Sequence, residues 1–176
     1  MIDFEAGVRV ERPIEEVFAF VSNPLLLPRW NSAVQTVHRT SGETGEPGST
    51  YSMERELPTG RVENRLEVFA REHPAEFGIR TTSGPTPFRY RYRFASDGAS
   101  TVIHLDATVE LPGVAAVLGP LAARAVRRGV DANFAALKLT LEANAPEAQS
   151  PDRATEPHRL GNAHAESRSE PPKPLS

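Results

Sequence analysis

The chain has 176 residues, of which 39% are hydrophobic and 24% are charged, so its size and composition favour one globular domain. Its net charge of −3 gives no long-range attraction to nucleic acid, and the absence of cysteine excludes disulfides, thiol catalysis and thiolate metal sites. The first residues lack the apolar run of a signal peptide, and no segment approaches the roughly 18 apolar residues of a membrane span, so we expect a soluble cytoplasmic protein with no integral membrane segment.

The N-terminal part of the sequence predicts a strand followed by two short helices. Residues 2–11 alternate between apolar and charged side chains, which is the period of a strand with one buried face. Pro13 precedes an apolar segment at 14–21 with two glutamates in its first turn, a pattern typical of a helix N-terminus. The Asn-Pro step that follows ends this helix, and a second short helix is predicted over 24–29.

Six further segments show the same two-residue alternation and are separated by turn-forming residues. The links between them are short, which favours antiparallel neighbours. The predicted strands are 33–40, 49–57, 61–71, 76–82, 87–95 and 100–110.

The turn between the last two strands predicts their register. Asp97-Gly98 is a strong two-residue hairpin signal. A turn centred on these two residues pairs Phe94 with Thr101. That register places Arg89 opposite Asp106 on the outer face of the sheet, as a cross-strand ion pair.

A long amphipathic helix is predicted over 120–143. A helix that follows an antiparallel sheet buries its apolar stripe on that sheet, and a curved sheet leaves room for a pocket between the two. The expected fold class is therefore α+β, with a seven-stranded antiparallel sheet and a long C-terminal helix. The apolar stripe comprises Leu118, Ala122, Val126, Val130, Phe134, Leu137 and Leu141.

The composition changes near residue 144. Residues 144–176 contain six prolines and no aromatic residue, isoleucine or valine, so they cannot bury enough apolar area to offset the entropy of ordering. We therefore predict a folded domain at 1–143 and a disordered tail at 144–176. The alternative is a docking or regulatory segment.

The alternation of each strand predicts which side chains face inward. Most of them are apolar, with a few polar members, as is typical of a small-molecule pocket. The candidate ligand-binding residues are Tyr51, Met53, Arg55, Asn64, Leu66, Phe77, Ile79, Thr81, Phe88, Tyr90, Tyr92, Ile103, Leu105, Val126, Val130 and Phe134.

The polar members of this set also have purely structural interpretations. Tyr90 and Tyr92 fit core rings whose hydroxyls reach the surface. Asn64 can satisfy a neighbouring backbone group, and Arg55 can extend its charged end out of the open end of the sheet. An inward arginine and asparagine on adjacent strands remain the hardest to explain without a partner.

The sequence offers little catalytic chemistry. No histidine pair has the spacing of a metal site, so we expect no metal, and no phosphate-binding glycine loop is present, so we expect no cofactor. The arginines at 89, 91 and 93 share the outer face of the sheet with acidic side chains, and the net charge is negative, so we expect no nucleic-acid partner. An acid–base enzyme would rely on Tyr90 or Tyr92 as the acid and Arg55 as an electrostatic clamp.

Four stretches in order resemble one known group of proteins. They are RVERPIEEVFAFVSNPLLLPRWN at 9–31, GSTY at 48–51, FASDGASTVIHL at 94–105 and FAALKLTLE at 134–142. Together they resemble the START-like, or SRPBCC, superfamily, which includes polyketide cyclase/dehydrase and lipid-transport proteins. The resemblance covers 1–143 and leaves the tail out.

The resemblance implies a helix-grip fold with a deep cavity between sheet and helix. Such cavities typically hold lipids, polyketides, sterols or other apolar molecules. Trp30 resembles the family tryptophan after the short helices, a position that either closes the core, which we favour, or contacts the ligand. Members include carriers, cyclases, dehydratases and receptors, and no common catalytic motif carries over, so the resemblance alone assigns no activity.

Three functions follow in order of preference. The first is a non-enzymatic binder or carrier of a small hydrophobic molecule, lipid-like or polyketide-like. The second is a polyketide aromatase, cyclase or dehydratase that uses the polar cavity residues. The third is a structural or interaction module, in which the tail docks a partner or the short helices join a coenzyme-Q-type assembly. The sequence assigns no catalytic residue, ligand identity or oligomeric state.

Overall fold

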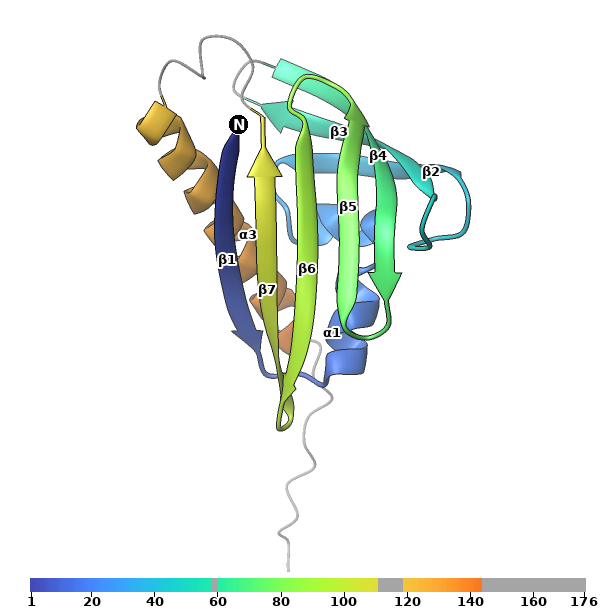
Figure 1. Ribbon diagram of the computed structural model, residues 1–176, viewed down its shortest axis with the longest axis vertical. Coiled ribbons are helices and arrows are strands. Elements are labelled where there is room, and N and C mark those ends of the chain that lie inside the picture. The colour runs from blue at the N-terminus through green and yellow to red at the C-terminus, as the bar shows by residue number, and fades with distance from the viewer. Residues whose placement is uncertain (58–59, 111–118, 144–176) are drawn as a thin grey trace, which may run out of the picture. The chain divides into compact units, whose positions relative to one another are not determined.

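The strands of the chain form one antiparallel sheet, seen in a computed structural model that describes residues 1–57, 60–110 and 119–143 (Figure 1). Their order across the sheet is β1-β7-β6-β5-β4-β3-β2. The elements are β1 (Ile2–Val10), α1 (Ile14–Val21), the 3-10 helix η1 (Pro24–Arg29), β2 (Val34–Ser41), β3 (Thr50–Leu57), β4 (Gly60–Glu72), β5 (Glu76–Ser83), β6 (Phe88–Asp97), β7 (Ser100–Val109) and α3 (Gly119–Ala143).

This architecture confirms the predicted fold class, an α+β helix-grip fold in which a seven-stranded sheet curves around a long C-terminal helix. Every predicted strand and helix is present, with ends that differ by no more than a few residues. The predicted tail at 144–176 and Leu118 of the predicted stripe lie outside the described residues. No helix in the described part of the chain is long and apolar enough to cross a membrane.

The register between β6 and β7 differs from the prediction. Asp97 pairs with Ser100 and Phe94 with Ile103, so Arg91, not Arg89, lies opposite Asp106. The hairpin loop consists of Gly98 and the alanine after it, because glycine adopts the positive φ of 65° that the first loop position requires. Moving the loop by one residue shifts the pairing by two, so the inward and outward faces remain as predicted.

The two halves of α3 differ in how they contact the sheet. The four buried residues of the helix are Val130, Phe134, Leu137 and Leu141, so burial begins at its midpoint and continues toward its C-terminal end. In the first half, Leu121 is 71% exposed and Val126 is only half-buried. The helix is therefore anchored to the sheet by its C-terminal half, while its N-terminal half stands at the rim.

β1 is an outer strand of the sheet (Figure 1), and side chains of α3 form hydrogen bonds with its free edge. Arg127 donates to the carbonyl of Glu5 at 3.2 Å, and Lys138 donates to the carbonyl of Arg9 at 2.8 Å. The carboxylate of Glu142 accepts from the backbone N–H at position 11, at 2.8 Å. These bonds satisfy backbone groups that an edge strand leaves unpaired, so they fix α3 alongside β1.

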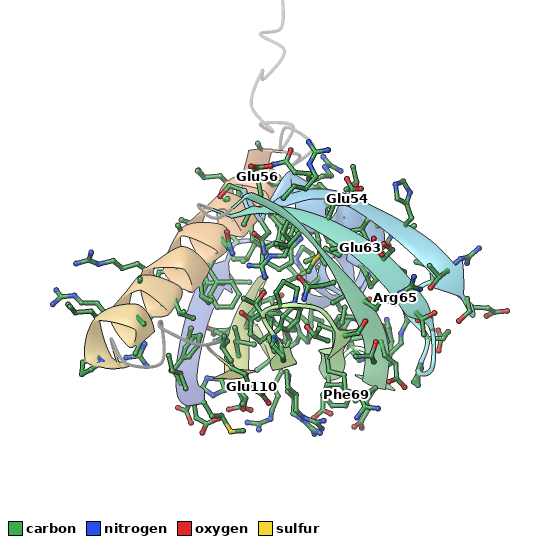
Figure 2. All side chains as sticks on the ribbon, turned by 90° about the horizontal axis from the view of Figure 1, so that it is seen from above. Glu54, Glu56, Glu63, Arg65, Phe69 and Glu110 are labelled. Carbon is green, nitrogen blue, oxygen red and sulfur yellow. The ribbon has the colours of Figure 1, made fainter. Side chains whose placement is uncertain are left out.

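The outer face of the sheet is charged. Glu54, Glu63 and Arg65 point away from the interior on β3 and β4, as Figure 2 shows. On β5, Arg80 pairs with Glu67 at 2.8 Å. The opposite face carries the apolar side chains, so the space between the sheet and α3 is the interior of the protein.

Candidate functional site

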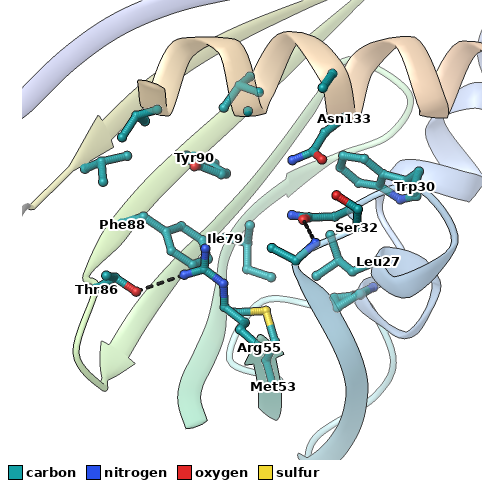
Figure 3. A pocket seen from close by; sticks show the side chains of 18 of the residues that line it. Leu27, Trp30, Ser32, Met53, Arg55, Ile79, Thr86, Phe88, Tyr90 and Asn133 are labelled. Carbon is teal, nitrogen blue, oxygen red and sulfur yellow. Dashed lines mark hydrogen bonds between the residues drawn. The ribbon is translucent and has the colours of Figure 1, made fainter. Parts of the chain in front are cut away.

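A pocket of about 340 Å³ lies between the inner face of the sheet, the segment after η1 and α3 (Figure 3). Its walls come from elements that are far apart in the sequence. The lining residues are Val21, Pro24, Leu27, Trp30, Asn31, Ser32, Ala33, Met53, Arg55, Phe77, Ile79, Thr86, Phe88, Tyr90, Tyr92, Val109, Val126, Gly129, Val130, Ala132 and Asn133.

Aromatic rings form the wall on β5 and β6. Phe88, Tyr90 and Tyr92 occupy alternate positions of β6, and this spacing directs all three rings to the same face. Their ring centroids lie 4.6 Å apart for Phe88 and Tyr90 and 6.3 Å apart for Tyr90 and Tyr92. Phe77 of β5 stacks on Tyr92 at 6.4 Å. The result is a continuous aromatic wall that carries two phenol hydroxyls, those of Tyr90 and Tyr92.

Arg55 is the one charged side chain among the described residues that line the pocket. It is half-buried, and its Nη1 donates a hydrogen bond to Oγ1 of Thr86 at 2.8 Å (Figure 3). Burial lowers the pKa of the guanidinium, and the neighbouring Tyr90 partly opposes that shift. Arginine still carries its charge at neutral pH, so the pocket contains a permanent cation.

The two tyrosines are poor acids in this environment. Burial raises the pKa of Tyr90, although the charge of Arg55 acts in the opposite direction. Burial also raises the pKa of Tyr92, and Tyr90 adds to that rise. Both hydroxyls therefore stay protonated at neutral pH and serve as neutral hydrogen-bond donors.

The opposite side of the pocket is formed by the segment after η1 and by α3. Trp30 is only 4% exposed, and its indole N–H has no hydrogen-bond partner within the described residues. Ser32 and Asn133 add polar groups beside it, and the Asn31 side chain accepts from the backbone N–H of Ala33 at 3.2 Å (Figure 3). The pocket is thus polar at two sides and apolar between them.

A sequence model of the family described as polyketide cyclase/dehydrase and lipid transport matches residues 1–142 of this chain. The chain belongs to this family. The match covers every described element up to the last turn of α3, so it includes the whole pocket, and it confirms the resemblance inferred from the sequence. No curated protein matches the chain.

Solved structures with the same fold have low sequence identity to this chain. The protein TTHA0849 from Thermus thermophilus has a TM-score of 0.71 at 15% identity, covering 82% of this chain and 100% of that one. A START superfamily protein from Mycobacterium smegmatis has a TM-score of 0.66 at 18% identity, covering 80% and 97%. The Zhui aromatase/cyclase from Streptomyces sp. R1128 has a TM-score of 0.65 at 14% identity, covering 84% and 98%. At these identities the similarity shows the fold alone.

Many of the ligand-binding candidates predicted from the sequence lie together at the pocket. Their role in binding remains a prediction. The predicted residues that line the pocket are Met53, Arg55, Phe77, Ile79, Phe88, Tyr90, Tyr92, Val126 and Val130.

The other predicted residues face inward but do not line the pocket. The hydroxyl of Tyr51 accepts from the backbone N–H of Gly45 at 2.8 Å, and Thr81 accepts from the N–H of Phe88 at 3.3 Å. Asn64 is fully buried, and neither of its polar side-chain atoms has a hydrogen-bond partner within the described residues. The predicted residues in this inward but non-lining group are Tyr51, Asn64, Leu66, Thr81, Ile103, Leu105 and Phe134.

Sequence reasoning missed the parts of the wall that come from irregular segments. Asn31, Ser32 and Thr86 lie outside helices and strands, so no periodicity marks them as inward. Asn133 does carry a signal, because it lies three residues after Val130 and therefore on the same side of α3. A polar residue beside a buried stripe is the pattern that would have identified it.

The outer face of the sheet carries a separate cluster of polar groups. Nε2 of His104 lies 3.4 Å from a carboxylate oxygen of Asp106 and 3.9 Å from one of Glu5. These three residues are close enough to share a cation, but Asp106 already pairs with Arg93. The cluster is therefore an ion-pair network on the outer face of the sheet, where the alternation of β7 predicts His104 and Asp106 to lie.

Proposed function

We propose that this protein binds or carries a small hydrophobic molecule in the pocket between the sheet and α3. The observation that carries the proposal is the apolar wall of aromatic and aliphatic side chains around a cavity of about 340 Å³. That volume falls at the lower end of the range of about 300–1,000 Å³ typical of ligand pockets. The family described as polyketide cyclase/dehydrase and lipid transport supports the same class of ligand.

The composition of the pocket favours carriage over catalysis. The described residues that line it include no aspartate, glutamate, histidine, lysine or cysteine. Buried Tyr90 and Tyr92 hold their protons tightly, because burial raises both pKa values. General acid–base catalysis needs a group that exchanges its proton near the working pH, and these side chains do not supply one.

The proposal is tested by extracting protein purified from its native host and identifying co-purified small molecules by mass spectrometry. In parallel, a neutral fluorescent probe such as N-phenyl-1-naphthylamine is titrated into the purified protein. We expect Val126→Trp to fill the pocket and abolish probe binding. Leu121→Trp adds the same ring to the same helix at a position that is 71% exposed, so it serves as the matched control.

Two results would remove the proposal. One is the absence of any co-purified molecule together with no probe binding. The other is probe binding that Val126→Trp leaves unchanged, because the probe then lies elsewhere. We further propose that binding resides in residues 1–143, so deletion of 144–176 is expected to leave probe affinity unchanged.

A second candidate function is that of a polyketide aromatase, cyclase or dehydratase. Tyr90 and Arg55 favour it, since a phenol donor and a cation line one pocket and interact electrostatically. The Zhui aromatase/cyclase shares the fold. This candidate predicts turnover of a poly-β-keto substrate that Tyr90→Phe or Arg55→Ala abolishes in a folded protein. Unchanged turnover in both variants would exclude these roles.

A further inference from the structure

Arg55 is a cation with no anionic partner inside a mostly apolar pocket that carries no other charged side chain among the described residues. Its one hydrogen-bond partner is the neutral hydroxyl of Thr86, and no carboxylate in the described part of the chain pairs with it. The short segments 58–59 and 111–118, which complete the domain, contain no aspartate or glutamate in their sequence. The arginines on the outer face behave differently, since Arg80 and Arg91 each pair with a glutamate at 2.8 Å.

Placing such a charge in a pocket is costly unless something compensates it. A cation that leaves water loses hydration energy, and this loss is recovered only by a counter-charge with good hydrogen-bond geometry. Thr86 satisfies one donor of a guanidinium that has five. The remaining donors are available to a ligand, and an anionic group on a bound molecule offers acceptors in the form that arginine binds best, a two-oxygen acid.

We propose that the ligand is an apolar monoanion, of which a carboxylic acid is the simplest case, and that Arg55 selects it by pairing with the acid group. This inference rests on the proposed function, because it assigns the chemical class of the molecule that occupies the same pocket. Arg55 is then the residue that determines specificity, and Thr86 is a positioning residue that holds the guanidinium.

The geometry of the pocket gives the ligand an orientation. Arg55 and Thr86 lie at one side, and Trp30, Ser32 and Asn133 lie at the other (Figure 3). The acid group lies at Arg55, within reach of the Tyr90 hydroxyl as an additional neutral donor. The apolar body then extends over the inner face of the sheet toward α3. The apolar side chains along this path are Met53, Phe77, Ile79, Tyr92 and Val130.

The test compares pairs of molecules that differ only in their charge. Dodecanoate is compared with dodecanol, and 4-phenylbenzoate with 4-phenylbenzyl alcohol, each by displacement of N-phenyl-1-naphthylamine from the full-length protein at neutral pH. Hydrogen bonds to charged groups contribute about 1.5–3 kcal/mol, so the acid of each pair is expected to bind about 10- to 150-fold more tightly than its alcohol.

Three variants assign this preference to a side chain. Arg55→Met keeps the apolar stem and removes the charge, so the acid and the alcohol are expected to bind alike. Arg55→Lys keeps the charge and is expected to retain part of the preference. Arg65→Met removes an exposed arginine from the outer face of β4 and is expected to leave the preference unchanged. Circular dichroism establishes that each variant is folded.

Each outcome separates this inference from the proposed function. Equal binding of acid and alcohol to the wild-type protein, blocked by Val126→Trp, overturns the acid ligand and retains the hydrophobic binder. Displacement by neither member of either pair overturns both. A preference for the acid that survives in folded Arg55→Met overturns the assignment to Arg55. The comparison of acid with alcohol on the wild-type protein decides whether the ligand is an acid even where an Arg55 variant fails to fold.

Discussion

Truncating the apolar side chains of α3 one at a time is expected to produce a gradient of stability loss along the helix. Leu137 is fully buried, so Leu137→Ala removes atoms from a closed core and is expected to cost about 2–5 kcal/mol of the free energy of unfolding. Leu121 is 71% exposed, and Leu121→Ala is expected to change that free energy by no more than about 0.5 kcal/mol.

The informative positions lie between these extremes, at the pocket. Val130→Ala removes the equivalent of two buried methylene groups, which amounts to about 1.6 kcal/mol of lost transfer free energy. Val130 already borders a hollow, so its truncation creates no new closed cavity and the additional cavity term is absent. Val126 is half-buried at the same pocket, so Val126→Ala is expected to cost less than about 1 kcal/mol.

Urea denaturation of the four variants, fitted with a common slope, measures this gradient. Leu139→Ala, at a position that is 69% exposed near Leu137, controls for the loss of leucine itself from the helix. The reasoning is refuted if Val126→Ala or Val130→Ala costs as much as Leu137→Ala. That result means that side chains fill the space between α3 and the sheet, and the ligand pocket is then lost with it.

Two further predictions concern hydrogen bonds away from the pocket. Bonds from Ser100 and Arg9 lower the pKa of Glu11 below its ordinary value of 4.5, so the stability from this carboxylate is present above that value and is lost as pH falls through the folded-state pKa. Thermal melts between pH 3 and 7 are therefore expected to show Glu11→Gln less stable than wild type at neutral pH and equal to it at the acid end; a constant offset contradicts this. Tyr51→Phe leaves the buried N–H of Gly45 without an acceptor and is expected to cost about 1–3 kcal/mol by urea denaturation, while a loss near zero would show that water replaces the hydroxyl.

Much of the fold could be predicted from the sequence, because the period of the apolar residues shows which face of each strand or helix is buried. The alternation of β7 placed Ile103 and Leu105 inside and His104 outside, and the structure agrees. Periodicity does not report on register, which depends on which two residues form a turn. The β6–β7 hairpin uses Gly98 and Ala99, and this detail depends on the local φ of glycine and not on hydrophobicity.

The site was predictable in part for the same reason. Alternation separates inward from outward residues, but it does not say how far along a strand the space beneath them is filled. Tyr51 and Phe77 are both inward and nearly fully buried, yet only Phe77 reaches the pocket. The difference depends on which elements cover each position, and Thr86 enters the wall from a loop whose path no local pattern encodes.

The partial burial of α3 and the unpaired charge of Arg55 both lower the stability of the empty protein. A helix that packed along its whole length would fill the space in front of Phe77 and Tyr92 and leave no room for a ligand. Because burial on α3 begins only at Val130, the middle of the helix borders a hollow, and the packing that its walls lose must be offset by the rest of the core. When the pocket is empty, its apolar walls lack packing contacts and the guanidinium of Arg55 lacks part of its hydration. Occupancy by an apolar acid offsets both losses at once, so the empty protein is expected to gain more thermal stability from an acid than from the matching alcohol.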